Sequence, residues 1–208
     1  MQQFCQICCE APERMRDMRN FKVQYRETCE MAISEIRHAL SAADTDAAER
    51  FVNDLCEAEK VFLIGVGRVH LSLEAFTKRL CHLGIQAHCV GDITEPALTD
   101  KDILIVGSGS GESVIPVAIA KKAKELHAKR IIHIGSNPDG SMKEYTDYML
   151  RSPVQTRLNL PDEIPSEQIM TSLFEQSLLI LGDVVSCIIA DRKNLDLKAL
   201  WRYHANLE

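Results

Sequence analysis

The chain has 208 residues, 46% of them hydrophobic, and a formal net charge of −6, which suits one α/β domain with added helices. The acidic balance argues against a nucleic-acid backbone as partner. No apolar run of signal-peptide length opens the sequence, and the most apolar stretch, 173–190, carries Glu175, Gln176 and Asp183. These polar residues disfavour a membrane span. We therefore expect a soluble cytoplasmic protein that binds neither nucleic acid nor membrane.

Apolar spacing predicts two helices before residue 60, a long one over about 14–40 and a second one capped by Asp44. The pattern then changes to alternating strands and helices, which predicts a parallel sheet wound by helices. Strands are expected at 61–64, 85–90, 103–106, 130–134 and 148–150. The helices between them are expected at about 69–83 and 113–127, with a short one from Ser141.

The last quarter of the chain combines a loop with a long helix. Residues 151–165 contain three prolines and are expected to form a loop. Ser166 is expected to begin a helix that ends near Asp191 and is apolar nearly all round. Such a helix must pack against the sheet, a partner subunit or both.

Three cysteines cluster near the start, at Cys5, Cys8 and Cys9, and five others are scattered. A structural zinc site needs four ligands, and no second Cys or His pair stands at matching spacing. We interpret the cysteines as reduced thiols of a cytosolic protein and expect no metal site.

The most informative motif follows the strand expected at 103–106. Glycines let the backbone turn tightly, and the N-terminus of the next helix adds unpaired N–H donors and partial positive charge. Together with the serine hydroxyls they predict an uncharged cradle for the phosphate of a small metabolite such as a phosphosugar. No Lys or Arg is present, so this is not the Gly-Lys-Ser/Thr nucleotide loop. The residues of this serine loop are Ser108, Gly109, Ser110, Gly111, Glu112 and Ser113.

Two alternatives stay open for the serine loop. The serines would also suit a helix cap, although one serine suffices for that role. Glu112 suits the first turn of a helix even without a ligand, because the helix dipole favours an acid there.

A second glycine loop, Gly65-Val66-Gly67, follows the strand at 61–64 and continues into Arg68, Val69 and His70. A dinucleotide fingerprint requires glycine at position 70 and an acid closing the next strand, and neither is present. We expect this loop to line the same pocket, with Arg68 contacting phosphate or sugar hydroxyls. A structural ion pair is the alternative role for Arg68.

Glu175 stands in the apolar helix, where burial would suit it as a general base. Exposure to solvent or pairing with an arginine is its alternative. His204 lies in a polar tail and by itself would be an exposed histidine. Apart from His70 in the first loop, which is considered below, the other histidines receive no role. These are His38, His82, His88, His127 and His133.

These motifs resemble those of sugar isomerase (SIS) domain proteins, and specifically of the 6-phospho-3-hexuloisomerase family. The domain-level similarity rests on 65–68, on the serine loop and on 136–138; the narrower one rests on 79–84, 174–175 and 204–208. The resemblance covers about 25–208, which we expect to be a single SIS domain. Residues 1–24 then form an N-terminal extension and the start of the first helix.

The resemblance implies a flavodoxin-like three-layer α/β/α sandwich around a five-stranded parallel sheet, in a homotetramer. It implies interconversion of 3-hexulose 6-phosphate and fructose 6-phosphate through an enediol(ate), with no cofactor. By motif, Glu175 would be the base with His204 assisting, and Gly67, Arg68 and the serine loop would bind substrate. The site is expected to be shared between subunits if the long helix and the tail pack across an interface.

The chain departs from the family where members usually have Ser-Gly after the first-loop arginine, since Val69 and His70 stand there. This departure predicts altered specificity or lost activity, with His70 as a possible new ligand contact or catalytic group. A phosphosugar sensor without catalysis and an isomerase of a different sugar phosphate therefore stay open.

Overall fold

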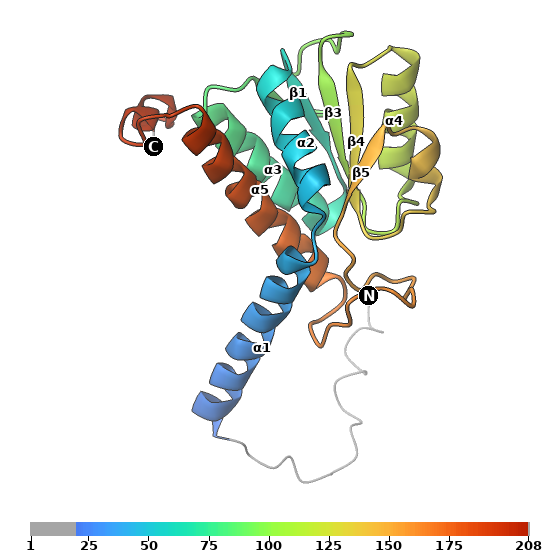
Figure 1. Cartoon of the computed structure of the whole chain (residues 1–208), viewed down its shortest axis with the longest axis vertical. Coiled ribbons are helices and arrows are strands. Elements are labelled where there is room, and N and C mark those ends of the chain that lie inside the picture. The colour runs from blue at the N-terminus through green and yellow to red at the C-terminus, as the bar shows by residue number, and fades with distance from the viewer. Residues whose placement is uncertain (1–19, 208) are drawn as a thin grey trace, which may run out of the picture.

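The computed structural model describes residues 20–207, so Cys5, Cys8 and Cys9 lie outside the described residues. Its centre is a five-stranded sheet in the order β2-β1-β3-β4-β5, in which every neighbouring pair is parallel (Figure 1). The strands are β1 (Val61–Ile64), β2 (Ala87–Cys89), β3 (Ile103–Gly107), β4 (Arg130–Gly135) and β5 (Tyr148–Arg151).

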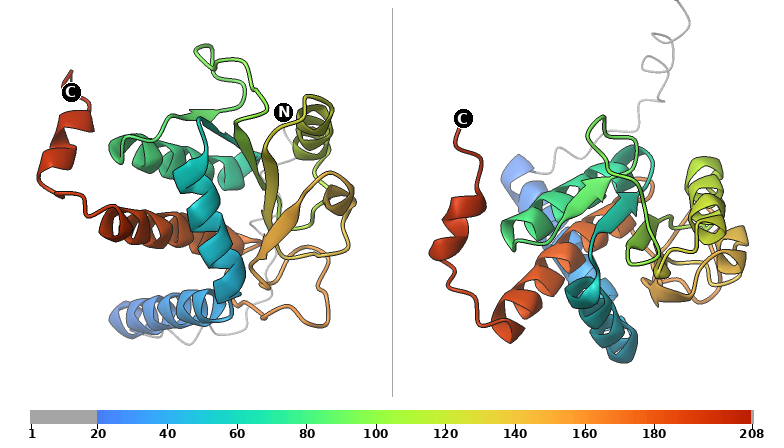
Figure 2. Two further views of the ribbon diagram at one scale, coloured as in Figure 1. Left: turned by 45° about the horizontal axis from the view of Figure 1, so that its top comes forward. Right: turned by 90° about the horizontal axis from the view of Figure 1, so that it is seen from above.

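Helices cover both faces of the sheet, which gives the expected three-layer α/β/α sandwich. The helices α2, α3 and α5 lie on one face, and α4 with η1 lies on the other (Figures 1 and 2). Alternate strand residues enter opposite cores: Leu63 and Ile105 face α3 and α5, whereas Phe62 and Leu104 face α4. The elements are α1 (Phe21–Ser41), α2 (Thr45–Glu57), α3 (Gly67–His82), α4 (Val114–Glu125), η1 (Ser141–Glu144), α5 (Ser172–Arg192) and η2 (Ala199–Tyr203).

Several boundaries follow the local sequence signals closely. The side chain of Asp44 accepts hydrogen bonds from the N–H groups of Asp46 and Ala47, which confirms it as the cap of α2. The glycine Gly84 takes φ +77° directly after α3. The strand expected at 85–90 is shorter, because only 87–89 pair with β1. Of the helix expected at 14–40, the described part begins at Phe21.

The start expected for the long helix is wrong by six residues. Ser166 is engaged elsewhere: its hydroxyl donates to the Glu35 carboxylate of α1 at 2.7 Å. The same carboxylate accepts from the N–H of Glu167 and the side-chain amide of Gln168. These bonds hold 166–168 against α1 in a non-helical path, and α5 begins only at Ser172.

By length and composition alone, α5 could cross a membrane, but more than half of its most apolar window is buried within the protein. Its closest neighbour is α3, where Gly182 brings the backbones together: a Cβ at Gly182 would lie 2.9 Å from the ring of Phe76. A row of apolar side chains on α5 is exposed. These are Leu179, Ile180, Val184 and Ile188.

Candidate active site

A cavity of about 570 Å³ opens at the carboxyl ends of β1 and β3, the edge where open parallel sheets bind ligands. Its walls come from the first loop, the serine loop with the start of α4, the loop 152–171 and the start of α5. The lining residues are Val66, Val69, Gly109, Ser110, Glu112, Ser113, Val114, Ile115, Thr156, Arg157, Met170, Thr171 and Phe174.

The serine loop is organised by its own hydroxyls. The Ser108 hydroxyl donates to Ser113 Oγ at 3.1 Å and accepts from the Gly111 N–H at 3.2 Å. Ser113 stands at the N-cap of α4 but makes no side-chain capping bond, so the capping alternative is wrong for it. The start of α4 therefore presents backbone donors and partial positive charge to the cavity.

Glu112 lies at the rim and is already engaged. Its carboxylate accepts from the hydroxyl of Ser141 at 2.6 Å and from the Ser141 N–H at 2.7 Å. These bonds hold the pKa of Glu112 below its usual value. This carboxylate ties the serine loop to η1.

A histidine without a predicted role forms a hydrogen bond to the backbone of the serine loop. His133 on β4 is buried, and its Nε2 donates to the carbonyl of Ser108 at 2.8 Å, since a carbonyl can only accept. Burial lowers the pKa of His133 below its ordinary 6.5. The only sequence signal for His133 is its place among the isoleucines of an apolar strand, which indicates burial but no role.

Arg68 and Glu175 form an ion pair, the alternative left open for both. The side chain of Glu175 is 9% exposed and that of Arg68 is 64% exposed. The hydroxyl of Thr171 donates to Glu175 Oε1 at 2.9 Å, and Ser72 binds the Glu175 carbonyl. Both charged residues line a hollow of about 190 Å³ next to the serine-loop cavity. Thr171 lines the cavity and bonds to Glu175, which lines the hollow.

The remaining predicted site residues do not all lie at the cavity. Val69 lines the cavity, whereas His70 is outside its lining and lies 3.5 Å from the Glu74 carboxylate. Gly67 begins α3 with φ +58°, a conformation that favours glycine. His204 stacks on His82 at the other end of α3, with 5.5 Å between ring centroids. The rise of about 1.5 Å per residue places His82 about 21 Å along the helix from Arg68.

No family model matches the chain. The 3-hexulose-6-phosphate isomerase of Bacillus subtilis is 33% identical over 176 residues, which cover 85% of this chain and 95% of that protein. The chain belongs to this isomerase family. The fold agrees: a Methanococcus jannaschii protein, whose crystal structure inferred a function of 3-hexulose-6-phosphate isomerase, matches with a TM-score of 0.75 and 30% identity. That match covers 88% of this chain and 99% of the other.

The fold also matches a solved structure of low sequence identity. The Vibrio vulnificus NanR protein complexed with ManNAc-6P matches with a TM-score of 0.65 and 15% identity, over 86% of this chain and 64% of that one. At that identity only the fold is shared.

Three polar residues that line the cavity were not predicted from the sequence: Thr156, Arg157 and Thr171. All three lie on the irregular segment between β5 and α5, where neither strand nor helix periodicity assigns a direction to a side chain. Within the described residues, no group of three or more His, Cys, Asp or Glu side chains could hold a metal ion.

Proposed function

We propose that the protein interconverts 3-hexulose 6-phosphate and fructose 6-phosphate, with Glu175 as the base. The observation that carries this proposal is the buried Glu175 carboxylate, which accepts a hydrogen bond from Thr171, a residue that lines the serine-loop cavity. Membership of the isomerase family supports it. The Arg68 guanidinium fixes the orientation of the carboxylate, as a base requires.

The serine loop binds the phosphate of the sugar. Serine hydroxyls, backbone N–H groups and the N-terminus of α4 converge on the cavity, and this donor set suits an anion. A sugar phosphate anchored there extends its carbon chain past Val69 and Phe174 towards Glu175.

The chemistry requires one proton to move between neighbouring carbons. Glu175 removes the proton from C2 of 3-hexulose 6-phosphate, and the electrons form a cis-enediolate across C2 and C3. The hydroxyl on C2 gives up its proton as the new carbonyl forms, the oxygen on C3 gains one, and Glu175 returns the carbon-bound proton to C3. A histidine suits the exchange between oxygens, because imidazole transfers protons near neutral pH.

His204 serves this role from a second subunit of a homo-oligomer, a tetramer by family resemblance. Within one chain it lies at the far end of α3 from Arg68 and cannot reach Glu175. The exposed apolar row on α5 continues from Leu179, which lines the Arg68–Glu175 hollow. An apolar face beside an incomplete site favours a partner subunit there.

The first test is an isomerisation assay with 3-hexulose 6-phosphate, coupled to detection of fructose 6-phosphate. We expect turnover by the wild type; a folded protein without turnover contradicts the proposal. A panel of other ketose and aldose phosphates then separates an isomerase of another sugar from a protein that only binds.

The shared site has its own test. Subunits carrying Glu175→Gln and subunits carrying His204→Ala are assayed separately and after co-refolding in equal amounts. If the two groups come from different subunits, random mixing restores both native groups in about a quarter of the sites. Recovered activity supports the shared site, and a mixture no more active than its components contradicts it.

A second candidate function is phosphosugar sensing without catalysis. The observation that favours it is Val69, whose apolar side chain lines the cavity where the family usually carries a serine hydroxyl. A sensor binds fructose 6-phosphate without converting any member of the panel.

A further inference from the structure

The serine-loop cavity holds one arginine that neither the motifs nor the proposed chemistry uses. Only two charged residues line it, Glu112 and Arg157. Arg157 is exposed on the loop 152–171, and its guanidinium makes no hydrogen bond or ion pair within the described part of the chain. Arg68, by contrast, is paired with Glu175. Arg157 is therefore the cation available to a ligand in this cavity.

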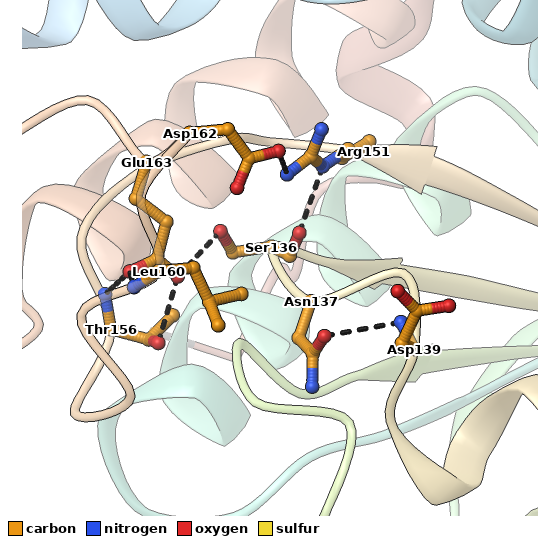
Figure 3. Close-up of polar contacts among 8 residues, drawn as sticks. All are labelled: Ser136, Asn137, Asp139, Arg151, Thr156, Leu160, Asp162 and Glu163. Atoms are coloured by element: carbon orange, nitrogen blue, oxygen red, sulfur yellow. Dashed lines mark hydrogen bonds and ion pairs between the residues drawn. The ribbon is translucent and has the colours of Figure 1, made fainter.

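A compact network fixes the segment that carries Arg157 (Figure 3). The Glu163 carboxylate accepts four hydrogen bonds, from Ser136 Oγ at 2.9 Å, Thr156 Oγ1 at 2.8 Å, Thr156 N at 3.1 Å and Leu160 N at 2.9 Å. No cation within the described residues pairs with this carboxylate, so its role is to gather donors from the loop.

Two further contacts close the same segment. Val154 and Ile164 form an isolated parallel bridge at its base. Arg151 of β5 donates to the carbonyl of Ser136 at 2.9 Å and pairs with Asp162. Residues 154–164 thus form a loop closed on itself, with Arg157 next to Thr156, one of the residues bonded to Glu163.

A sugar phosphate is negatively charged, and the serine loop contains no cation to balance that charge. A phosphate monoester carries about −1.5 to −2 charges at neutral pH. The serine loop offers only neutral donors, and the nearby Glu112 carboxylate, on which the Arg157 charge acts, is itself negative. A guanidinium can bind two phosphate oxygens at once and offset this charge.

We propose that Arg157 binds the substrate phosphate opposite the serine loop, and that Glu163 is the positioning residue that folds the loop presenting it. The proposal rests on the proposed function for the identity of the substrate. Its first test nevertheless uses inorganic phosphate, so that the two can fail separately.

The test compares wild type, Arg157→Gln, Arg157→Lys and the control Lys121→Gln, which removes a positive charge from the exposed side of α4. The phosphate Kd is obtained from the rise in Tm with phosphate concentration at constant ionic strength. We expect Arg157→Gln to raise Kd about 10- to 100-fold, as for loss of a charged hydrogen-bond partner. Arg157→Lys should fall between it and the wild type, and Lys121→Gln should match the wild type. An Arg157→Gln protein that binds phosphate as tightly as the control overturns the proposal.

Glu163→Ala tests the positioning role, because it removes both carboxylate oxygens and leaves the N–H groups of Thr156 and Leu160 without their acceptor. We expect a raised phosphate Kd, and a double variant with Arg157→Gln that binds no more weakly than Arg157→Gln alone. If the increases in phosphate Kd caused by the two substitutions multiply in the double variant, Glu163 does not act through Arg157 and its role is overturned. If Glu163→Ala does not fold, Ser136→Ala removes one hydroxyl donor to the carboxylate. An unchanged phosphate Kd in that variant also overturns the role of Glu163.

Turnover separates this inference from the proposed function. If both are right, Arg157→Gln raises KM for 3-hexulose 6-phosphate by a similar factor and changes kcat much less. If the wild type does not turn over any sugar phosphate while phosphate binding still depends on Arg157, the proposed function fails and the inference stands.

Discussion

Replacing Glu175 by glutamine separates its chemical role from its structural role. The amide keeps the shape of the carboxylate and an oxygen for the Thr171 hydroxyl, but it cannot take a proton from carbon. Loss of a general base costs about 10²- to 10⁴-fold in kcat, or about 3–5 kcal/mol of barrier. The lost ion pair costs little stability, about 0–1 kcal/mol, because the Arg68 side chain is 64% exposed. A chain of this size then loses at most about 4 °C in Tm.

The assay is isomerisation of 3-hexulose 6-phosphate beside thermal unfolding of the same samples. Glu125→Gln is a matched control, because Glu125 is also ion-paired but lies on exposed α4 outside the cavity. We expect the control to retain full kcat and the Glu175→Gln protein to lose at least about a hundredfold. A Glu175→Gln protein with more than about a tenth of wild-type kcat refutes the assignment of Glu175 as the base. A Tm lowered far beyond about 4 °C refutes the conclusion that the ion pair contributes little to stability.

Three further predictions concern the stability of the fold. Gly140→Ala places a Cβ 2.7 Å from the carbonyl oxygen of Ser110, so we expect about 1–3 kcal/mol of destabilisation and weaker phosphate binding; unchanged urea unfolding contradicts this. Asp102→Asn removes the fully buried carboxylate 3.0 Å from Lys60 and leaves Lys60 with Glu59 at 4.0 Å, and we expect a loss of about 3 kcal/mol in the free energy of unfolding, measured with urea. Burial lowers the pKa of His133 in the folded protein, so as the pH drops the His133 side chain is protonated in the unfolded chain before it is protonated in the folded one. The free energy of unfolding therefore falls as the pH drops below about 6.5. The slope should become shallower in His133→Gln, and an identical slope excludes His133 as its source.

Local sequence patterns were sufficient where one short segment determines the outcome. The run Val61–Ile64 is apolar at every position and forms β1 with those bounds. Asp44 caps α2 as its position predicts, and the serine loop forms the wall of a cavity at the sheet edge. In each case the deciding atoms lie within a few residues of one another, so the chain sequence carries the whole signal.

The contacts that complete the site join residues far apart in the chain, and no periodic pattern encodes them. Glu35 binds Ser166 across 131 positions and so shifts the start of α5 to Ser172. Arg68 pairs with Glu175 across 107 positions instead of facing the serine loop.

The layered fold, the family motifs and the serine loop could be predicted from the order of the amino acids. That Arg157 lines the cavity and that His204 lies at the far end of α3 became evident only in the folded chain. The physical reason is that side-chain direction in an irregular segment, or in a tail docked on a helix, is set by distant packing partners and not by neighbours in the chain.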